Sequence, residues 1–147
     1  MSQWSIPFDV LAARIHARVE DVVRKVTFDL FSALLVRSPV DTGRFRANWN
    51  ISYGKVDPTI DNMTSDGRIK ESLGKVMKGP VGGIVYMCNS LPYAGVLEYG
   101  GYPNPAKSGT KTVGGFSLQA PSGMVRITAQ EYAQYVQTAL ASSGGAA

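Results

Sequence analysis

Residues 7–37 read P-F-D-V-L-A-A-R-I-H-A-R-V-E-D-V-V-R-K-V-T-F-D-L-F-S-A-L-L-V-R, the most regular pattern in the chain. Apolar residues recur there at intervals of three and four, which places them along one stripe of an α-helix. The pair Ser38-Pro39 ends the pattern, because the residue before a proline avoids the α region. The sequence therefore predicts one long helix from Pro7 to Arg37. Its stripe consists of Phe8, Leu11, Ile15, Val19, Val22, Val26, Leu30 and Ala33.

The predicted helix is long for its chain. A helix of about 30 residues measures about 45 Å, whereas a compact domain of 147 residues is about 38 Å across. Further apolar residues widen the apolar face toward the C-terminal half, so that half should be buried on more than one side. We expect either a kink or neighbouring copies of the chain that cover the excess. The candidate interface residues on this helix are Phe8, Leu11, Ile15, Val19, Phe28 and Phe31.

The composition indicates a single globular domain over residues 1–147. Hydrophobic residues make up 44% and charged residues 18%, which argues against extensive disorder. The net charge of +4 permits contact with nucleic acid but is too small to demonstrate it. The lone Cys88 excludes a disulfide within the chain and is expected to be a small buried thiol on a strand. The N-terminal residues show no signal-peptide pattern, and we expect no membrane span.

The remaining pattern predicts two strands and a second helix. Residues 45–53 alternate apolar and polar side chains, as a half-buried strand does, and residues 82–89 form a β-rich run. A short turn or helical segment leads to Gly100, and residues 122–142 have helical spacing. Residues 55–80 and 101–117 are expected to be irregular excursions, although residues 65–77 can hold a short helix that Gly74 weakens. Residues 143–147 are expected to form a flexible tail.

These elements define the predicted fold class, α+β. In it, the long N-terminal helix and the C-terminal helix pack on one face of a small antiparallel β-sheet.

The stretch S-P-V-D-T-G-R-F-R-A-N-W, residues 38–49, contains the Asp-Thr-Gly core of aspartic proteases. That chemistry needs an all-β dimer with a small residue after the glycine, but here a long helix precedes the motif and Arg44 follows it. A structural role explains each residue. Pro39 ends the helix, Asp41 and Thr42 can bond nearby backbone N–H groups, and Gly43 can adopt a positive φ before a strand. We expect a turn, not a catalytic site.

Other catalytic patterns are weaker. The single His16 lacks the second His or Cys that would complete a typical zinc site. Glu98 is isolated in the sequence, so we expect it to cap backbone groups or to pair with Arg44 or Arg46. The 16 glycines form neither a Walker motif nor a dinucleotide fingerprint. We therefore predict that the chain is not an enzyme and holds no cofactor or metal.

The two predicted excursions are basic. Between residues 68 and 111, the cations outnumber the two acids Glu71 and Glu98. These cations either form a solvated surface or meet an acidic partner or DNA phosphates. No aromatic platform accompanies them, so base-specific reading is unsupported. The cations are Arg68, Lys70, Lys75, Lys78, Lys107 and Lys111, of which Lys107 and Lys111 are candidate partner contacts.

Three motifs follow the long helix in order: P-V-D-T-G-x-h-R (h apolar), N-x-x-x-Y-A-x-x-L-E-x-G and A-P before a C-terminal helix. Together they resemble the neck and tail-completion proteins of long-tailed bacteriophages over about residues 8–140. The matching residues are Pro39, Val40, Asp41, Thr42, Gly43, Phe45 and Arg46, then Asn89, Tyr93, Ala94, Leu97, Glu98 and Gly100, then Ala120 and Pro121.

The resemblance implies a structural virion protein that forms a ring, a hexamer or dodecamer, at the head-to-tail junction. The expected partners are a portal-connector or head-closure protein, a tail terminator or tail tube protein, and DNA passing through the ring; no membrane is involved. Assembly would take place in the host cytoplasm and the product would lie in the virion neck or tail.

In this family the first turn, Pro39, Asp41, Thr42, Gly43 and Arg46, would fix one corner. Asn89, Tyr93, Glu98 and Gly100 would brace a second corner. Two alternatives stay open: a tail terminator or minor tail protein and, more remotely, a small basic DNA-associated protein.

Overall fold

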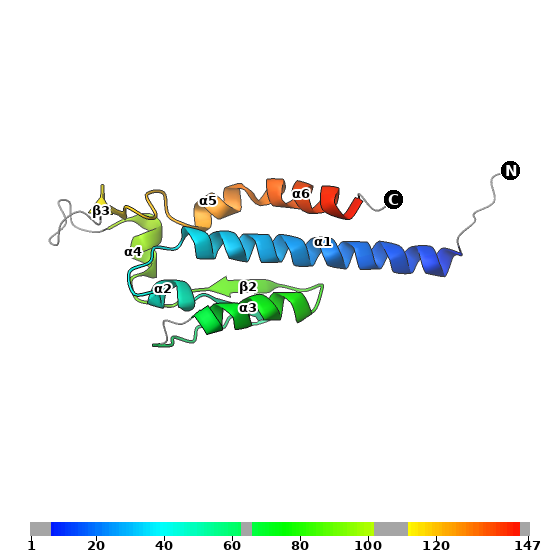
Figure 1. Cartoon of the computed structure of the whole chain (residues 1–147), viewed down its shortest axis with the longest axis horizontal. Coiled ribbons are helices and arrows are strands. Elements are labelled where there is room, and N and C mark those ends of the chain that lie inside the picture. The colour runs from blue at the N-terminus through cyan, green and yellow to red at the C-terminus, as the bar shows by residue number, and fades with distance from the viewer. Residues whose placement is uncertain (1–6, 63–65, 102–111, 145–147) are drawn as a thin grey trace.

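The computed structural model describes residues 7–62, 66–101 and 112–144 and confirms the predicted fold class (Figure 1). A long N-terminal helix packs on the C-terminal helix and on a two-stranded antiparallel sheet. The elements in chain order are α1 Phe8–Arg37, α2 Arg44–Ala47, β1 Asn50–Tyr53, α3 Asp66–Lys78, β2 Val85–Cys88, α4 Ala94–Tyr99, β3 Thr112–Val113, β4 Phe116–Ser117, α5 Val125–Gln130 and α6 Tyr132–Gly144.

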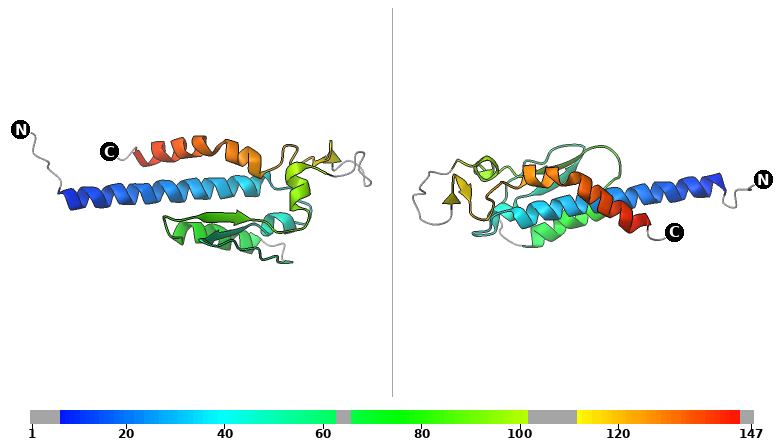
Figure 2. Two further views of the ribbon diagram at one scale, coloured as in Figure 1. Left: turned by 180° about the vertical axis from the view of Figure 1, so that it is seen from behind. Right: turned by 90° about the horizontal axis from the view of Figure 1, so that it is seen from above.

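Helix α1 is the central element of the fold. Helices α5 and α6 run back along one side of α1, while α3 and the β1–β2 sheet lie side by side along another (Figures 1 and 2). In the sheet, Ile51 pairs with Met87 and Tyr53 pairs with Val85. A second small hairpin, β3–β4, lies beside α4 at the end of the molecule opposite the N-terminus (Figure 1).

The core forms where the C-terminal half of α1 meets α2, α3 and the sheet. Phe31 is fully buried at 0% exposure, and Phe28 packs against the same cluster. Both residues were candidates for an interface between copies; that prediction is wrong for Phe31, because its own chain covers it completely. The buried core cluster contains Phe31, Leu34, Leu35, Phe45, Trp49, Ile51, Val76, Leu91, Leu97, Ala120 and Met124.

Two buried hydrogen bonds connect the end of α1 to the core. Ser38 Oγ donates a hydrogen bond to the Leu34 carbonyl at 2.6 Å and accepts one from Trp49 Nε1 at 2.7 Å. The Ser38 hydroxyl and the Trp49 indole N–H therefore both have hydrogen-bond partners, as buried polar groups usually do. The Ser38-Pro39 pair thus ends the helix, as predicted, and its serine also fixes the tryptophan.

Two of the predicted elements differ from the structure near the first turn. Residues 44–47 form the short helix α2, and only Asn50–Tyr53 of the predicted strand is extended.

Residues 55–80 are not irregular throughout, because α3 covers 66–78 and buries Ser72 and Val76. Gly74 has no heavy atom within 4 Å of the position a Cβ would take, so close packing does not require a glycine there. Its effect is the entropic destabilisation of a helix by glycine, about 1 kcal/mol relative to alanine. The buried face of α3 outweighs that cost.

The C-terminal third also departs from the prediction. The expected helix over 122–142 is two helices, α5 and α6, which meet at Glu131, and α6 extends to Gly144 into the expected flexible tail. The expected excursion 101–117 contains the hairpin strands Thr112–Val113 and Phe116–Ser117. Lys107 and Lys111 lie outside the described residues.

Candidate functional site

The N-terminal turns of α1 project beyond the rest of the fold (Figures 1 and 2). Helix α6 packs on α1 between Arg37, which bonds Glu131, and Arg18, whose Nε donates to Ser143 Oγ at 3.3 Å. Residues 8–19, which we call the overhang, are all exposed except for the half-buried Leu11. The helix does not kink to bring these turns back onto its own chain. The excess length predicted from the sequence is therefore real.

The overhang presents large apolar side chains to solvent. Phe8 is 83% exposed, Ile15 57% and Val19 51%. With Leu11 they lie within an arc of about 80° on the helix; we call these four residues the apolar stripe. Fully burying a large apolar side chain contributes roughly 1.5–3 kcal/mol. Contiguous exposed apolar patches of this kind mark interaction sites on soluble proteins.

Charged residues flank the apolar stripe without entering it. Asp9, His16 and Glu20 lie on one side, and Arg14, Arg18 and Asp21 lie on the other. His16 Nε2 lies 3.1 Å from Glu20 Oε1, so the single histidine contacts a neighbour one turn away on its own helix. The flanks carry both signs of charge, and the surface is therefore suited to apolar contact more than to a strongly charged partner.

The first turn, predicted as a structural corner, has the expected backbone. Gly43 has φ 87°, and it precedes the short helix α2 in place of the expected strand. The Arg44 backbone N–H donates to Thr42 Oγ1 at 3.3 Å, and Arg46 Nη2 donates to the Ser38 carbonyl at 3.4 Å. Asp41 lies exposed on the turn.

The second predicted corner is built around a buried carboxylate. Glu98 is 6% exposed and accepts hydrogen bonds from the backbone N–H groups of Met124 at 2.7 Å, Val125 at 2.8 Å and Arg126 at 2.9 Å. These are the orphan donors at the start of α5. Arg126 Nε also donates to Glu98 at 3.1 Å. The expected capping role is thus present, but the expected pairing with Arg44 or Arg46 is wrong, because Arg126 is the partner.

The pKa of Glu98 reflects two opposed effects. Burial raises the pKa, whereas the hydrogen bonds from Met124, Arg126 and Val125 lower it, and the bonds outweigh burial. The carboxyl therefore has a pKa below its ordinary value and stays ionised. A carboxyl group that acts as a general acid or base near neutral pH needs a raised pKa instead. Glu98 is a structural cap.

The two corners contact each other, which the sequence did not predict. Asn89 Nδ2 donates to the Phe45 carbonyl at 2.8 Å, and the Tyr93 ring centroid lies 5.9 Å from that of Phe45. Gly100 has φ 79°, and a Cβ there would lie 3.1 Å from the Phe116 ring. Asn89, Tyr93, Glu98 and Gly100 of the second corner thus each have a packing or backbone role. The two sequence motifs form one continuous structural unit centred on Phe45.

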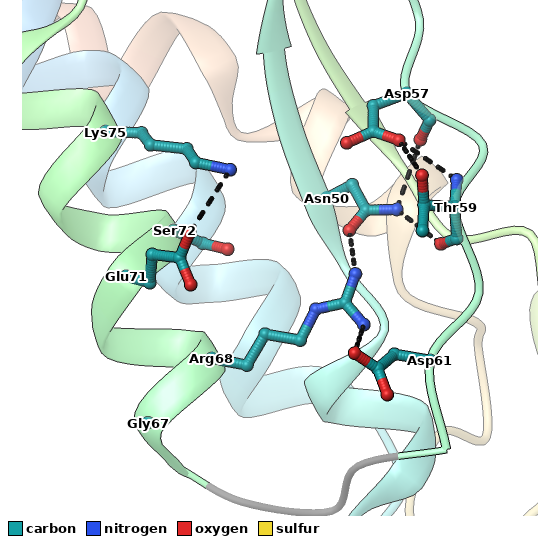
Figure 3. A pocket seen from close by; sticks show the side chains of 9 residues that line it. All are labelled: Asn50, Asp57, Thr59, Asp61, Gly67, Arg68, Glu71, Ser72 and Lys75. Carbon is teal, nitrogen blue, oxygen red and sulfur yellow. Dashed lines mark hydrogen bonds and ion pairs between the residues drawn. The ribbon is translucent and has the colours of Figure 1, made fainter.

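A polar pocket of about 360 Å³ lies between α3, β1 and residues 57–61 (Figure 3). Asn50 Nδ2 donates to the carbonyls of Asp57 at 3.1 Å and Thr59 at 2.7 Å. Arg68 donates to Asn50 Oδ1 at 2.6 Å and pairs with Asp61 at 3.2 Å. These contacts of Asn50 and Arg68 therefore hold the 57–61 segment against β1 and α3. The alternation over residues 45–53 places Asn50 among the polar positions of the predicted strand and therefore gave no sign of this pocket.

Two features are absent from the described part of the chain: a cluster of metal-ligating side chains and a helix able to cross a membrane. No group of three His, Cys, Asp or Glu side chains in it is placed to hold a metal ion. None of the helices within residues 7–62, 66–101 and 112–144 is both long and apolar enough to span a bilayer. Cys88 lies on β2 as predicted but is half-buried, with its Sγ 3.3 Å from Ser90 Oγ.

Comparison of the chain with known protein families, with characterised proteins and with solved structures finds no match.

Proposed function

We propose that this chain is a structural protein of a tailed-bacteriophage virion that forms a ring at the head-to-tail junction, without catalysis. The observation that carries the proposal is the overhang, where Phe8, Ile15 and Val19 of the apolar stripe are exposed and Leu11 is half-buried among the residues that the structure describes. The motifs around Asp41 and Glu98 resemble those of neck and tail-completion proteins. This resemblance is the reason for proposing a ring at the head-to-tail junction in particular. The proposed partners are the portal-connector or head-closure protein on one side and the tail terminator or tail tube protein on the other.

The asymmetry of the surface supports a ring. The N-terminal turns of α1, which carry the apolar stripe, lie at one end of an elongated chain (Figure 1). A contact between this end and a different surface of the next copy is heterologous. Heterologous contacts that close by rotation generate rings. A tail terminator or minor tail protein would use the surface in the same way, and the level of the ring in the particle distinguishes these roles.

The test is a pair of charge substitutions on the overhang. Ile15→Glu places a carboxylate in the apolar stripe, whereas Ala17→Glu places the same charge about 200° further round the helix. Light scattering should report an oligomer for the wild type and for Ala17→Glu, and a monomer for Ile15→Glu. The oligomer should persist as salt rises, because apolar burial is not screened.

Two results would count against the proposal. If the wild-type chain stays monomeric at high concentration, the proposed ring is contradicted. A chain that binds DNA with an affinity falling steeply with salt favours the DNA-associated alternative.

A further inference from the structure

Helix α6 is exposed on the surface yet carries no charged side chain. Its sequence is Y-A-Q-Y-V-Q-T-A-L-A-S-S-G. One side packs on α1 through the buried Ala139. The exposed side, which we call the outer face of α6, begins at Leu140, about 100° round the helix from Ala139, and continues through Ala133, Gln137 and Ala141.

A surface helix ordinarily carries charged residues on its solvent side. The outer face has none, and Leu140 is 44% exposed there. Beside it, the hydroxyls of Thr138 and Ser142 donate to carbonyls of their own helix, each at 3.0 Å. They therefore keep a hydrogen bond when water is removed. Depletion of charge is one of the compositional features of the core of a protein–protein interface.

The overhang of α1 fits this face in length and in chemistry. The 13 residues of α6 measure about 20 Å, and residues 8–19 measure about 18 Å. Ala133 and Ala141 are small and allow close approach, while Leu140 and the apolar stripe supply the large side chains. Neither surface buries a charge when the two are joined, so no desolvation penalty for a charged group opposes the contact.

We propose that the outer face of α6 in one copy receives the apolar stripe of the next copy, an inference that rests on the proposed ring. In this arrangement α6 lies between its own α1 and the overhang of its neighbour. Each copy then offers one stripe and one outer face, and contacts that run from each copy to the next are heterologous and close by rotation as a ring. Two copies that exchange stripes reciprocally would form a dimer, and the copy number measured by light scattering distinguishes the ring from that dimer. Pairing of two stripes would instead give a closed dimer and leave the outer face of α6 in water.

Disulfide trapping between two kinds of chain tests this contact. Both carry Cys88→Ser, which removes the native thiol; one also carries Ile15→Cys and the other Gln137→Cys. After mixing under mild oxidation, the main product should be the mixed dimer that joins positions 15 and 137. In the matched control, Lys70→Cys on the exposed surface of α3 replaces Gln137→Cys, and little mixed dimer should form. Separately, Leu140→Glu should weaken self-association at least about tenfold, as a carboxylate in the contact requires.

The outcomes separate the two proposals. Dimers that join two copies of position 15 mean that stripe meets stripe, which overturns this inference while self-association stands. An oligomer by light scattering that gives no mixed disulfide above the Lys70 control, or that tolerates Leu140→Glu, also overturns the α6 contact alone. A monomeric parent chain overturns the ring and this inference together.

Discussion

Replacing Glu98 with glutamine tests whether a buried carboxylate holds α4 to α5. One carboxylate oxygen accepts from Met124 and Val125, and the other accepts from the backbone and side chain of Arg126. Glutamine keeps the shape but offers one acceptor oxygen, so two donors lose their partner. Hydrogen bonds to charged groups contribute about 1.5–3 kcal/mol each. The side chain of Arg126 is 51% exposed and water replaces part of the loss, so we expect a cost of about 2–4 kcal/mol.

The assays are urea unfolding and thermal unfolding, each followed by circular dichroism. The parent chain and Glu98→Gln are both measured with Ile15→Glu added, because association would otherwise contribute to the measured stability. The substitution should lower the melting temperature by roughly 5–15 °C in a chain of this size. Glu71→Gln is the matched control. Its side chain is 70% exposed and lies 3.8 Å from Lys75, so it should change stability by less than about 0.5 kcal/mol.

The pH dependence gives the same test a second readout. Because the pKa of Glu98 is lowered on folding, its contribution is complete above the unfolded-state pKa and is lost as pH falls through the folded-state pKa. Glutamine does not titrate. The stability difference between the parent chain and the Glu98→Gln variant should therefore be large at neutral pH and shrink in acid. Equal stability at neutral pH would refute the capping role, and a difference that persists undiminished in acid would refute its electrostatic origin.

Three further predictions concern the backbone. Gly43→Val should destabilise by about 1–3 kcal/mol, since φ is 87° there; an unchanged urea midpoint would remove this account of the turn. Gly79→Ala should also destabilise, because a Cβ would overlap the ring of Tyr53, and an unaltered near-ultraviolet dichroism signal would contradict that contact. Asn50→Ala should free residues 57–59, which its side chain holds, so limited proteolysis should cut there faster than in wild type; an unchanged cleavage rate argues against the clamp.

The long helix could be predicted because its signal is local. Apolar spacing from Phe8 onward and the stop at Ser38-Pro39 depend only on neighbours in sequence. The excess length of α1 followed from the rise per residue. The sequence predicted more burial in the C-terminal half of this helix, but it did not show which interface candidates the chain covers itself. Only the packing of other elements leaves Phe8 exposed and buries Phe31.

Residues 45–49 show why short elements are ambiguous. Phe45, Ala47 and Trp49 are all buried, and their spacing of two predicts a strand. One helical turn followed by a bend buries the same side chains, and Gly43 begins that turn. Burial alternation over so few residues does not distinguish the two conformations, so the prediction failed at the boundary and held from Asn50 onward.

The long-range contacts could not be read from the sequence. Glu98 was recognised as an isolated acid, but its partner Arg126 is 28 positions away and is chosen by the packing of α4 against the start of α5. The contact of Asn89 with Phe45 spans 44 positions. Such pairs are set by tertiary structure and carry no local periodic signal.

The central claim is that identical copies cover the apolar stripe, and an electron-microscopy reconstruction of the purified assembly tests it most directly. The account predicts a closed ring in which residues 8–19 of each copy lie against the outer face of α6 in the next. Single chains, or a ring in which Phe8, Ile15 and Val19 face solvent, would contradict it.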